Sequence, residues 1–414
     1  MQNKKIAIVG AGPSGMMAAI RAAQLNQQVT LFEKNPLPGK KLLLSGKGRC
    51  NITNALSLDL FLKRFSKNGE FLRDAFKKFF NQDLIDFFKE RGLELKTERQ
   101  LRVFPVTDSS ESILEVLKKE LLRNKVQVIY GTRIQDIIVE GGKVKGVLIY
   151  GGSPIVFDAV IMATGGVSYA FTGSDGEGLR IIKDKGHKII VLRPGLVALK
   201  IKANFSKFLE GLTLKNISLK FNSGKKEITT EVGEMVFTAE GISGPLVLSL
   251  SGKVIDWLLE KKEVYVTINL KPGLTLEQLD NRFLREFKAS PKKGIRNIMK
   301  GVLPVKLGEL IIGIAGVNPD KKANQITLKE RSSLANILNG WRLNITGSGP
   351  IRDGMVTRGG VSLKEINPRT MESKLIKGLY FCGEMIDVDA DTGGFNLQAA
   401  FSTGYLAGES AVVS

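Results

Sequence analysis

Three glycines near the start of the chain have the spacing of a phosphate-binding turn. Gly10, Gly12 and Gly15 follow the short apolar run at residues 6–9 and precede an alanine-rich segment. In a strand–turn–helix unit the first glycine permits the tight turn, the second lets a pyrophosphate approach the backbone, and the third allows close packing of helix and strand. The N-terminus of the helix offers N–H groups to the phosphates. The spacing therefore predicts a dinucleotide site rather than a glycine turn in an unrelated α/β unit.

An acidic residue follows at the distance expected of a ribose ligand. Glu33 ends a second predicted strand, residues 29–32, and lies 23 positions after Gly10. The motif places such an acid about 20 residues on, where it accepts hydrogen bonds from ribose hydroxyls. A carboxylate there repels a 2′-phosphate, which favours FAD or NAD over NADP. A secretory signal is a poor alternative, because the glycine-proline turn interrupts the apolar stretch.

A basic, glycine-rich loop, residues 36–54, comes next. It leaves the second predicted strand, where the reactive half of a dinucleotide would lie. The loop contains Lys47, Arg49, Cys50 and Asn51 among its glycines. A mobile surface loop is the simple alternative. The density of these residue types beside a cofactor site favours a functional loop.

The charge of the chain is unusual for a small-molecule enzyme. There are 61 Lys and Arg against 41 Asp and Glu in 414 residues, a net charge of +20. The functional interpretation is attraction to a polyanion, RNA in particular. The alternatives are a lysine-rich proteome or simple solubility. Residues 271–306 are the most basic stretch, with nine Lys and Arg against three acids, and could dock RNA phosphates or form a solvated helix face.

Several classes of protein are disfavoured. No apolar run reaches about 18 residues, so no spanning helix or membrane partner is expected. Two cysteines, Cys50 and Cys382, imply neither a disulfide framework nor a metal site, and the cytoplasm is the expected compartment. Residues 387–391 resemble the start of a calcium loop but lack its later glycine and glutamate. The single histidine, His187, is expected to be structural.

The remaining pattern predicts an α/β domain interrupted by an insertion. A predicted hairpin, residues 132–150, leads to an apolar strand, residues 159–163, that ends in glycines. A hairpin in place of a crossover helix is typical of FAD domains of the two-dinucleotide-binding-motif type. The predicted parts are residues 1–192 and 343–414 for an interrupted Rossmann-like FAD-binding domain, and 193–342 for an insertion with a β-barrel or sandwich at 193–272 and helices at 273–342. The insertion is interpreted as a lid or substrate-binding module.

The C-terminal segment supports FAD over a simple NAD dehydrogenase. A strand ends in Gly383 and Glu384, and a glycine pair at 393–394 begins an alanine-rich helix. In FAD folds such a strand–Gly–acid element binds the ribityl and phosphate part. The helix aims its N-terminus at the flavin edge that gains negative charge on reduction.

Six segments together resemble the YhiN/BaiN-like family of bacterial flavoproteins, also called aminoacetone-oxidase-type FAD proteins. They are GAGPSG at 10–15, SGKGRCNITN at 45–54, ATGG at 163–166, TGSDGEG at 172–178, VTRGGVSL at 356–363 and GLYFCGEMIDVDADTGGFNLQAA at 378–400. The resemblance covers nearly the whole chain. The family loop usually reads G-G-G-R-C-N, and this chain departs slightly from it at residues 45–48.

The resemblance implies FAD as the cofactor. No second G-x-G-x-x-G is visible, so NAD(P)H is expected only as a transient reductant. No metal is expected, and the sequence does not predict an oligomeric state. The expected cofactor contacts are Gly10, Gly12, Pro13, Ser14, Gly15, Glu33, Lys34, Lys41, Gly46, Arg49, Val128, Thr164, Gly165, Gly166, Gly383, Glu384, Asn396 and Leu397.

The resemblance also implies hydride transfer from reduced flavin to a conjugated C=C bond. Some relatives act on steroid-like acids, and another branch reduces a uridine of large-subunit ribosomal RNA to dihydrouridine. Only an RNA substrate would explain the charge, so dihydrouridine synthesis is favoured. The alternatives are a small-molecule ene-reductase or amine oxidase, and a non-enzymatic flavin-carrying RNA-binding factor.

The expected mechanism passes a hydride from N5 of reduced FAD to C6 of a flipped-out uracil, while an acid protonates C5. Cys50 is the candidate acid, with packing as its alternative role. Arg49 would polarise a uracil carbonyl or hold phosphate. Asn51 would donate a hydrogen bond to flavin or base.

Overall fold

The computed structural model describes residues 3–260 and 262–413. They form two compact units, Met1–Gly195 with Pro350–Ser414 and Leu196–Gly349. Each unit has its own core of buried apolar side chains. The second unit is therefore an insertion into the first.

A parallel five-stranded sheet of order β20-β10-β1-β2-β6 forms the centre of the first unit. Its strands are β1 (Lys5–Val9), β2 (Gln28–Phe32), β6 (Gln127–Ile129), β10 (Ala159–Met162) and β20 (Leu379–Phe381). A small antiparallel sheet connects β6 to β10 in place of a crossover helix. It consists of β7 (Ile134–Glu140), β8 (Lys143–Ile149) and β9 (Pro154–Val156). This topology confirms the predicted interrupted Rossmann-like fold.

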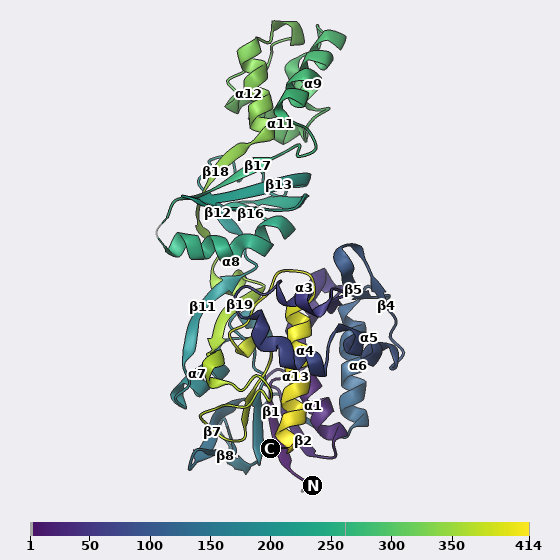
Figure 1. Ribbon diagram of the computed structural model, residues 1–414, viewed down its shortest axis with the longest axis vertical. Helices are drawn as coiled ribbons and strands as arrows, with labels where there is room; N and C mark the ends of the chain where they lie inside the picture. The colour runs from purple at the N-terminus through teal and green to yellow at the C-terminus, as the bar shows by residue number, and fades with distance from the viewer. Residues whose placement is uncertain (1–2, 261, 414) are drawn as a thin grey trace. The chain divides into compact units, whose positions relative to one another are not determined.

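Helix α13 (Phe395–Val413), near the C-terminus, packs along α1 (Pro13–Gln24), the helix of the glycine turn (Figure 1). Glycines make the close approach possible. A Cβ on Gly404 would lie 2.2 Å from the Ser14 carbonyl oxygen, and one on Gly408 would lie 2.4 Å from the Ala18 carbonyl oxygen. Helices from the first and last parts of the sequence thus stabilise each other.

Shorter elements surround this core. The helices are α2 (Lys40–Leu44), α3 (Leu58–Leu62), α4 (Arg73–Lys78), α5 (Asn81–Lys89), α6 (Ser110–Arg123) and α7 (Glu177–Asp184). The strands are β3 (Thr53–Asn54), β4 (Leu95–Thr97), β5 (Arg102–Pro105), β11 (Ile189–Gly195) and β19 (Val356–Val361). The phenylalanines of α3 to α5 form a core stripe, in which Phe61 packs edge-on against Phe76, Phe80 and Phe395.

Six strands of the second unit close into a ring. Neighbours pair in the order β13-β15-β16-β12-β18-β17, and β17 pairs back with β13. The strands are β12 (Leu199–Ile201), β13 (Thr213–Ser223), β15 (Gly233–Thr238), β16 (Gly241–Ser243), β17 (Val264–Asn269) and β18 (Trp341–Ser348), with β14 (Lys226–Thr229) added beside β13. Alternate residues of β17 and β18 are buried, so the ring is a packed antiparallel barrel, as predicted.

A helical module, residues 271–340, is inserted between β17 and β18. It contains α9 (Leu276–Ala289), α10 (Ile295–Met299), α11 (Val305–Ile314) and α12 (Leu328–Asn339). Two features differ from the sequence expectation. The predicted insertion ends at residue 342, after the helices, whereas β18 continues to Ser348 and is a strand of the barrel. Helix α8 (Pro245–Leu259) lies where only strands were expected, because its first half, LVLSLS, alternates with the period of a strand.

Candidate functional site

The glycine turn between β1 and α1 has one open position between two closed ones. A Cβ on Gly10 would lie 2.6 Å from the Ala163 carbonyl oxygen, and one on Gly15 would lie 1.9 Å from the Gly10 carbonyl oxygen. A Cβ on Gly12 would meet nothing within 4 Å. Gly12 is the N-cap of α1 and Pro13 its first residue, so the first-turn N–H groups have no acceptor within the helix. This cradle fits the pyrophosphate of a dinucleotide.

Glu33 is held beside this turn by backbone donors. Its Oε2 accepts from the Ala11 N–H at 2.8 Å, and its Oε1 accepts from the backbone N–H and side-chain amide of Asn35 at 2.9 and 2.8 Å. A carboxylate offers about four acceptor positions, so it can still accept one donor, such as a ribose hydroxyl. The neighbouring Lys34 instead pairs with Asp175 at 2.7 Å.

Four chain segments meet at Glu384. Its carboxylate accepts hydrogen bonds from Lys41 Nζ (2.5 Å), Ser168 Oγ (2.9 Å) and the Thr357 N–H (2.6 Å). These residues, the Glu384 cluster, come from α2, the loop after β10, β19 and the turn after β20. The structure thus brings the predicted Lys41 and Glu384 together. Ser168 and Thr357 are not among the predicted site residues, although each lies two residues from a glycine of the family motifs, Gly166 and Gly359.

The predicted glycines after β10 and β20 allow these segments to approach. A Cβ on Gly166 would lie 2.2 Å from Thr357 Oγ1, and one on Gly383 would lie 2.4 Å from Ser14 Oγ. Gly165 and Gly383 also have positive φ angles of 74° and 70°. Three further predicted contacts lie elsewhere in the first unit. Thr164, in the loop after β10, donates to Met385 Sδ at 3.4 Å. Val128 is half-buried in β6, and Leu397 is half-buried in the first turn of α13.

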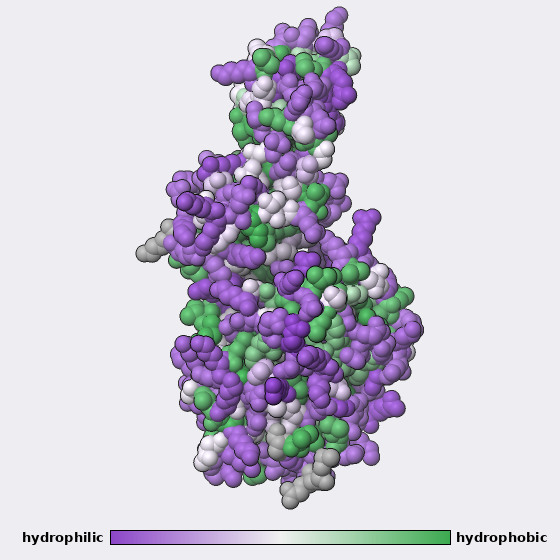
Figure 2. Space-filling view, in the orientation of Figure 1, coloured by the Kyte–Doolittle hydropathy of each residue, from purple (hydrophilic) through white to green (hydrophobic). Residues whose placement is uncertain are grey.

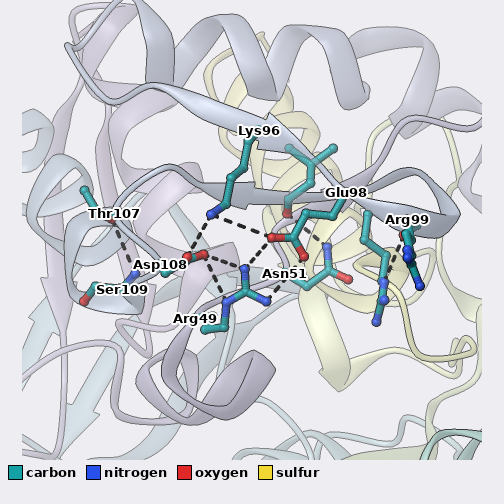
Figure 3. A network of polar contacts seen from close by, with 10 residues as sticks. Arg49, Asn51, Lys96, Glu98, Arg99, Thr107, Asp108 and Ser109 are labelled. Carbon is teal, nitrogen blue, oxygen red and sulfur yellow. Dashed lines mark hydrogen bonds and ion pairs between the residues drawn. The ribbon is translucent and has the colours of Figure 1, made fainter. Parts of the chain in front are cut away.

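Arg49, expected at the cofactor or substrate, points instead at two carboxylates (Figure 3). Its NH2 lies 2.5 Å from Glu98 Oε1 and 2.5 Å from Asp108 Oδ1, and its guanidinium carbon lies 4.3 Å from the centre of the Phe104 ring. Arg49 holds the pKa of Glu98 below its usual range, and Lys96 together with Arg49 does the same for Asp108. In this structure Arg49 therefore links the loop by ion pairs to the segments that follow β4 and β5.

Asn51 and Cys50 also have structural contacts. The Asn51 amide donates to the carbonyl oxygens of Thr53 and Val103 at 2.8 and 3.0 Å. Cys50 has a φ of +59° and no exposed surface, and burial raises the pKa of its thiol to about 12. The backbone at Gly46, with φ +56°, shares this left-handed geometry. The backbone of the loop is therefore strained at Lys47 and Cys50, whereas Gly46 adopts the same region without strain.

The N-terminus of α13 lies against this loop. A Cβ on Gly394 would lie 2.3 Å from the Thr53 carbonyl oxygen, and Asn54 donates to the Gly393 carbonyl oxygen at 3.2 Å. The predicted ligand Asn396 exchanges hydrogen bonds with the backbone N–H and carbonyl of Ala390 at 3.0 and 2.9 Å. Its amide thus shapes the turn into α13. The loop and the helix N-terminus, 340 residues apart in sequence, form one surface.

A group of charged residues that the sequence did not single out lies next to the Glu384 cluster. Arg358, which is 7% exposed, has its Nε 3.4 Å from Asp389 Oδ2. Ser66 donates to Asp389 at 2.7 Å, and Asn68 donates to Asp387 at 3.2 Å. Burial, and then the charge of Asp389, raise the pKa of Asp387. The alternating aspartates at residues 387–391 are the sequence feature that points to this group, and in the sequence they resemble only calcium ligands.

The single histidine lies in a chain of hydrogen bonds with the residue types of a hydrolase triad. Ser373 Oγ and Glu365 Oε2 each lie 3.1 Å from a ring nitrogen of His187. Ser373 Oγ also accepts the N–H groups of Leu375 and Ile376. Both lone pairs of this oxygen are therefore occupied, and Ser373 is only 6% exposed, so the hydroxyl is not placed to attack a substrate. Burial lowers the pKa of His187, so the neutral ring is a structural link.

No helix of residues 3–260 and 262–413 is long and apolar enough to cross a membrane. In the same described ranges, no three His, Cys, Asp or Glu side chains form a group that could hold a metal ion.

Two features separate this fold from a simple NAD dehydrogenase: the β7–β9 crossover and the distant C-terminal segment that returns to the cofactor edge. Both are features of FAD-binding oxidoreductases, and the open cradle at Gly12 with Glu33 beside it fits the adenine-nucleotide part of FAD. The family model described as HI0933-like protein Rossmann domain matches residues 4–410. The chain therefore belongs to the HI0933-like family, and it is an FAD-dependent oxidoreductase.

Relatives of known activity match the chain from end to end. It is 32% identical to the 3-dehydro-bile acid delta(4,6)-reductase of Clostridium scindens, over 98% of each chain. It is 29% identical to the ribosomal RNA dihydrouridine synthase of Escherichia coli, again over 98% of each. Among solved structures, the 3-ketosteroid delta1-dehydrogenase of Sterolibacterium denitrificans covers all of both chains with a TM-score of 0.53 at 14% identity, a likeness of fold.

Proposed function

We propose that this protein reduces a uridine of ribosomal RNA to dihydrouridine. The observation that carries the proposal is the net charge of +20. A steroid acid with one carboxylate needs one or two cationic groups, whereas RNA carries a charge on every nucleotide. The full-length similarity to a ribosomal RNA dihydrouridine synthase supports the same substrate.

The residues at the sheet edge would hold the cofactor. The α1 cradle at Gly12 would take the pyrophosphate, Glu33 the ribose, and the N-terminus of α13 the flavin edge that becomes negative. The Glu384 cluster would keep the contributing segments in register. Bound and reduced, FAD supplies a hydride to a conjugated C=C bond.

The protein must also deliver a proton to the second carbon of the reduced bond. Cys50 remains the proposed donor, because its loop lies against the N-terminus of α13, the proposed flavin edge, and its thiol is protonated at neutral pH. The same complete burial is what a packing residue would show. Substitution of Cys50 separates these two roles, as described in the Discussion. NAD(P)H is the proposed reductant.

An anaerobic experiment tests the proposal. The purified flavoprotein is reduced with NADPH and mixed with ribosomal RNA from cells that lack the enzyme. Flavin reoxidation is followed together with the mass of the RNA nucleosides. Reoxidation with a uridine that gains two hydrogens is the expected result. A flavin that stays reduced with mature RNA and with assembly intermediates would contradict an RNA substrate.

Reduction of a conjugated C=C bond in a small molecule is the second candidate. It is favoured by the similarity to the bile acid reductase, which at 32% identity is higher than the 29% identity to the Escherichia coli RNA enzyme. In a parallel arm, a steroid acid with a conjugated dienone replaces the RNA. Fast reoxidation by this compound and none by RNA would assign the protein to the small-molecule class.

A further inference from the structure

We infer that the helical module docks the ribosomal RNA, through a basic face formed by Arg285, Lys288, Lys292, Lys293 and Lys300. The inference rests on the proposed RNA substrate and assigns the docking to one part of the chain. Residues 196–349 hold 24 Lys and Arg against 14 Asp and Glu, so this unit carries +10 of the net +20 in 154 of 414 residues. Within it, the stretch 271–306 is the most one-sided, with nine bases against three acids.

The fold of the module leaves these charges exposed. Leu279, Phe283 and Phe287 anchor α9 in the core of the unit. Arg285 and Lys288 lie on the opposite, exposed side of the same helix. A capping box at Thr275 fixes the start of α9. Lys292, Lys293 and Lys300 are exposed on the segment that follows.

The basic face differs from the surface of the barrel in how its charges are compensated. On the barrel, Lys200 pairs with Glu240, Lys220 with Glu227, and Lys226 with Glu260. Within residues 3–260 and 262–413, no carboxylate forms an ion pair with any of the five residues of the basic face. Of the three acids of α9, Asp280 binds Arg331 at 2.7 Å, and Glu277 and Glu286 are exposed. Interspersed pairs suffice for solubility, whereas a one-sided face repels itself unless it meets an anion.

The side chains of the module suit a phosphate backbone rather than bases. Figure 2 shows the surface over α9 and α12 as mostly hydrophilic with scattered hydrophobic residues. The large hydrophobic side chains exposed on its described residues are aliphatic: Leu276, Val305, Ile314 and Leu328. Base stacking uses aromatic side chains, so the module has the charge for phosphates without a platform for bases. Its binding should therefore depend strongly on salt and weakly on sequence.

Three matched variants of the holoenzyme test this. The first replaces four residues of the face: Arg285→Gln, Lys288→Gln, Lys292→Gln and Lys293→Gln. The control removes the same charge from exposed, ion-pair-free positions of the first unit: Lys77→Gln, Lys89→Gln, Lys119→Gln and Lys145→Gln. A third variant keeps the charge of the face with Arg285→Lys, Lys288→Arg, Lys292→Arg and Lys293→Arg.

The readouts are the Kd for ribosomal RNA across a salt series, dihydrouridine formation, and flavin reduction by NADPH. Each lost phosphate contact lowers the salt slope by about 0.7–0.9. The first variant should therefore bind at least about tenfold more weakly at 100 mM salt, with a slope reduced by about three if all four residues contact phosphates. The control and the charge-retaining variant should stay within about twofold of the wild type, and all should reduce their flavin normally.

The outcomes separate the docking inference from the proposed function. Equal weakening by the first variant and the control would overturn docking at this face, because only the overall charge would then matter. Dihydrouridine formation by the wild type, unchanged in the first variant, would also overturn docking while leaving the proposed function intact. Selective loss of RNA binding in the first variant, with no dihydrouridine from the wild type, would support docking and overturn the proposed function.

Discussion

The two glycine-rich loops of the first unit, residues 10–15 and 45–54, differ in which atoms are available for chemistry. In the turn, Gly10 and Gly15 are enclosed by backbone while the space above Gly12 is open. In the loop, the guanidinium of Arg49 is bound to Glu98 and Asp108, and the amide nitrogen of Asn51 is bound to two backbone carbonyls. The turn works through backbone N–H groups, whose direction is set locally. The side chains of the loop are directed by whichever partners the fold brings near them.

The largest expected effect is at the open glycine. In Gly12→Val the new side chain points into free space, so the protein folds, but it occupies the place of the pyrophosphate. We expect loss of bound FAD, measured as the ratio of flavin to protein absorbance, with the far-UV circular dichroism of the apoprotein retained. A fully loaded yellow protein would show that the turn does not hold the pyrophosphate.

The next effect is expected at Cys50. Cys50→Ala should keep FAD, while turnover falls by about 10²-fold or more if the thiol is the proton donor. The measurement is the single-turnover rate of flavin reoxidation by substrate. An unchanged rate would assign Cys50 to packing. The loop would then have a structural role at Cys50 as well as at Arg49.

An enclosed glycine of the turn provides the matched contrast to Gly12. In Gly15→Ala the Cβ would lie 1.9 Å from the Gly10 carbonyl oxygen, so the backbone must shift. We expect a loss of about 1–3 kcal/mol in the free energy of unfolding, typical of overpacking, measured by denaturant titration. If this variant were as stable as the wild type, the close approach of turn and helix would not be required.

The smallest expected effect is on the acid stability of the protein, compared between the wild type and Arg49→Gln. The pKa values of Glu98 and Asp108 are lower in the folded protein than in the unfolded chain, so the unfolded chain takes up protons first as the pH falls. Their stabilising contribution is therefore present above about pH 4 and is lost below it. The wild type should lose more of its Tm than Arg49→Gln between pH 6 and pH 3, and salt should shrink the difference. If Arg49→Gln instead retains FAD and its Tm but loses turnover, Arg49 acts on the substrate.

The sequence was a good guide wherever a role depends on neighbours in the chain. The turn at Gly10 to Gly15, the hairpin crossover and the late strand–Gly–acid element are local patterns, and the family and the parallel sheet followed from them. It does not reveal the partners of Arg49 and Ser168. Arg49 meets Glu98 and Asp108, 49 and 59 residues away, and Ser168 meets Glu384, 216 residues away. Nothing in the spacing of these residues shows that they touch.

The sequence by itself thus determined the dinucleotide turn, the acid at Glu33, the interruption of the domain and the excess of positive charge, because backbone sterics and composition act over short distances or none. Only the tertiary structure decided that β13 and β17 close the barrel and that the helical module enters between β17 and β18. It also decided which charges are neutralised. Among the residues that the structure describes, Arg49 has carboxylate partners and Arg285 has none, because a salt bridge depends on where the fold places the carboxylates and not on the number of charges.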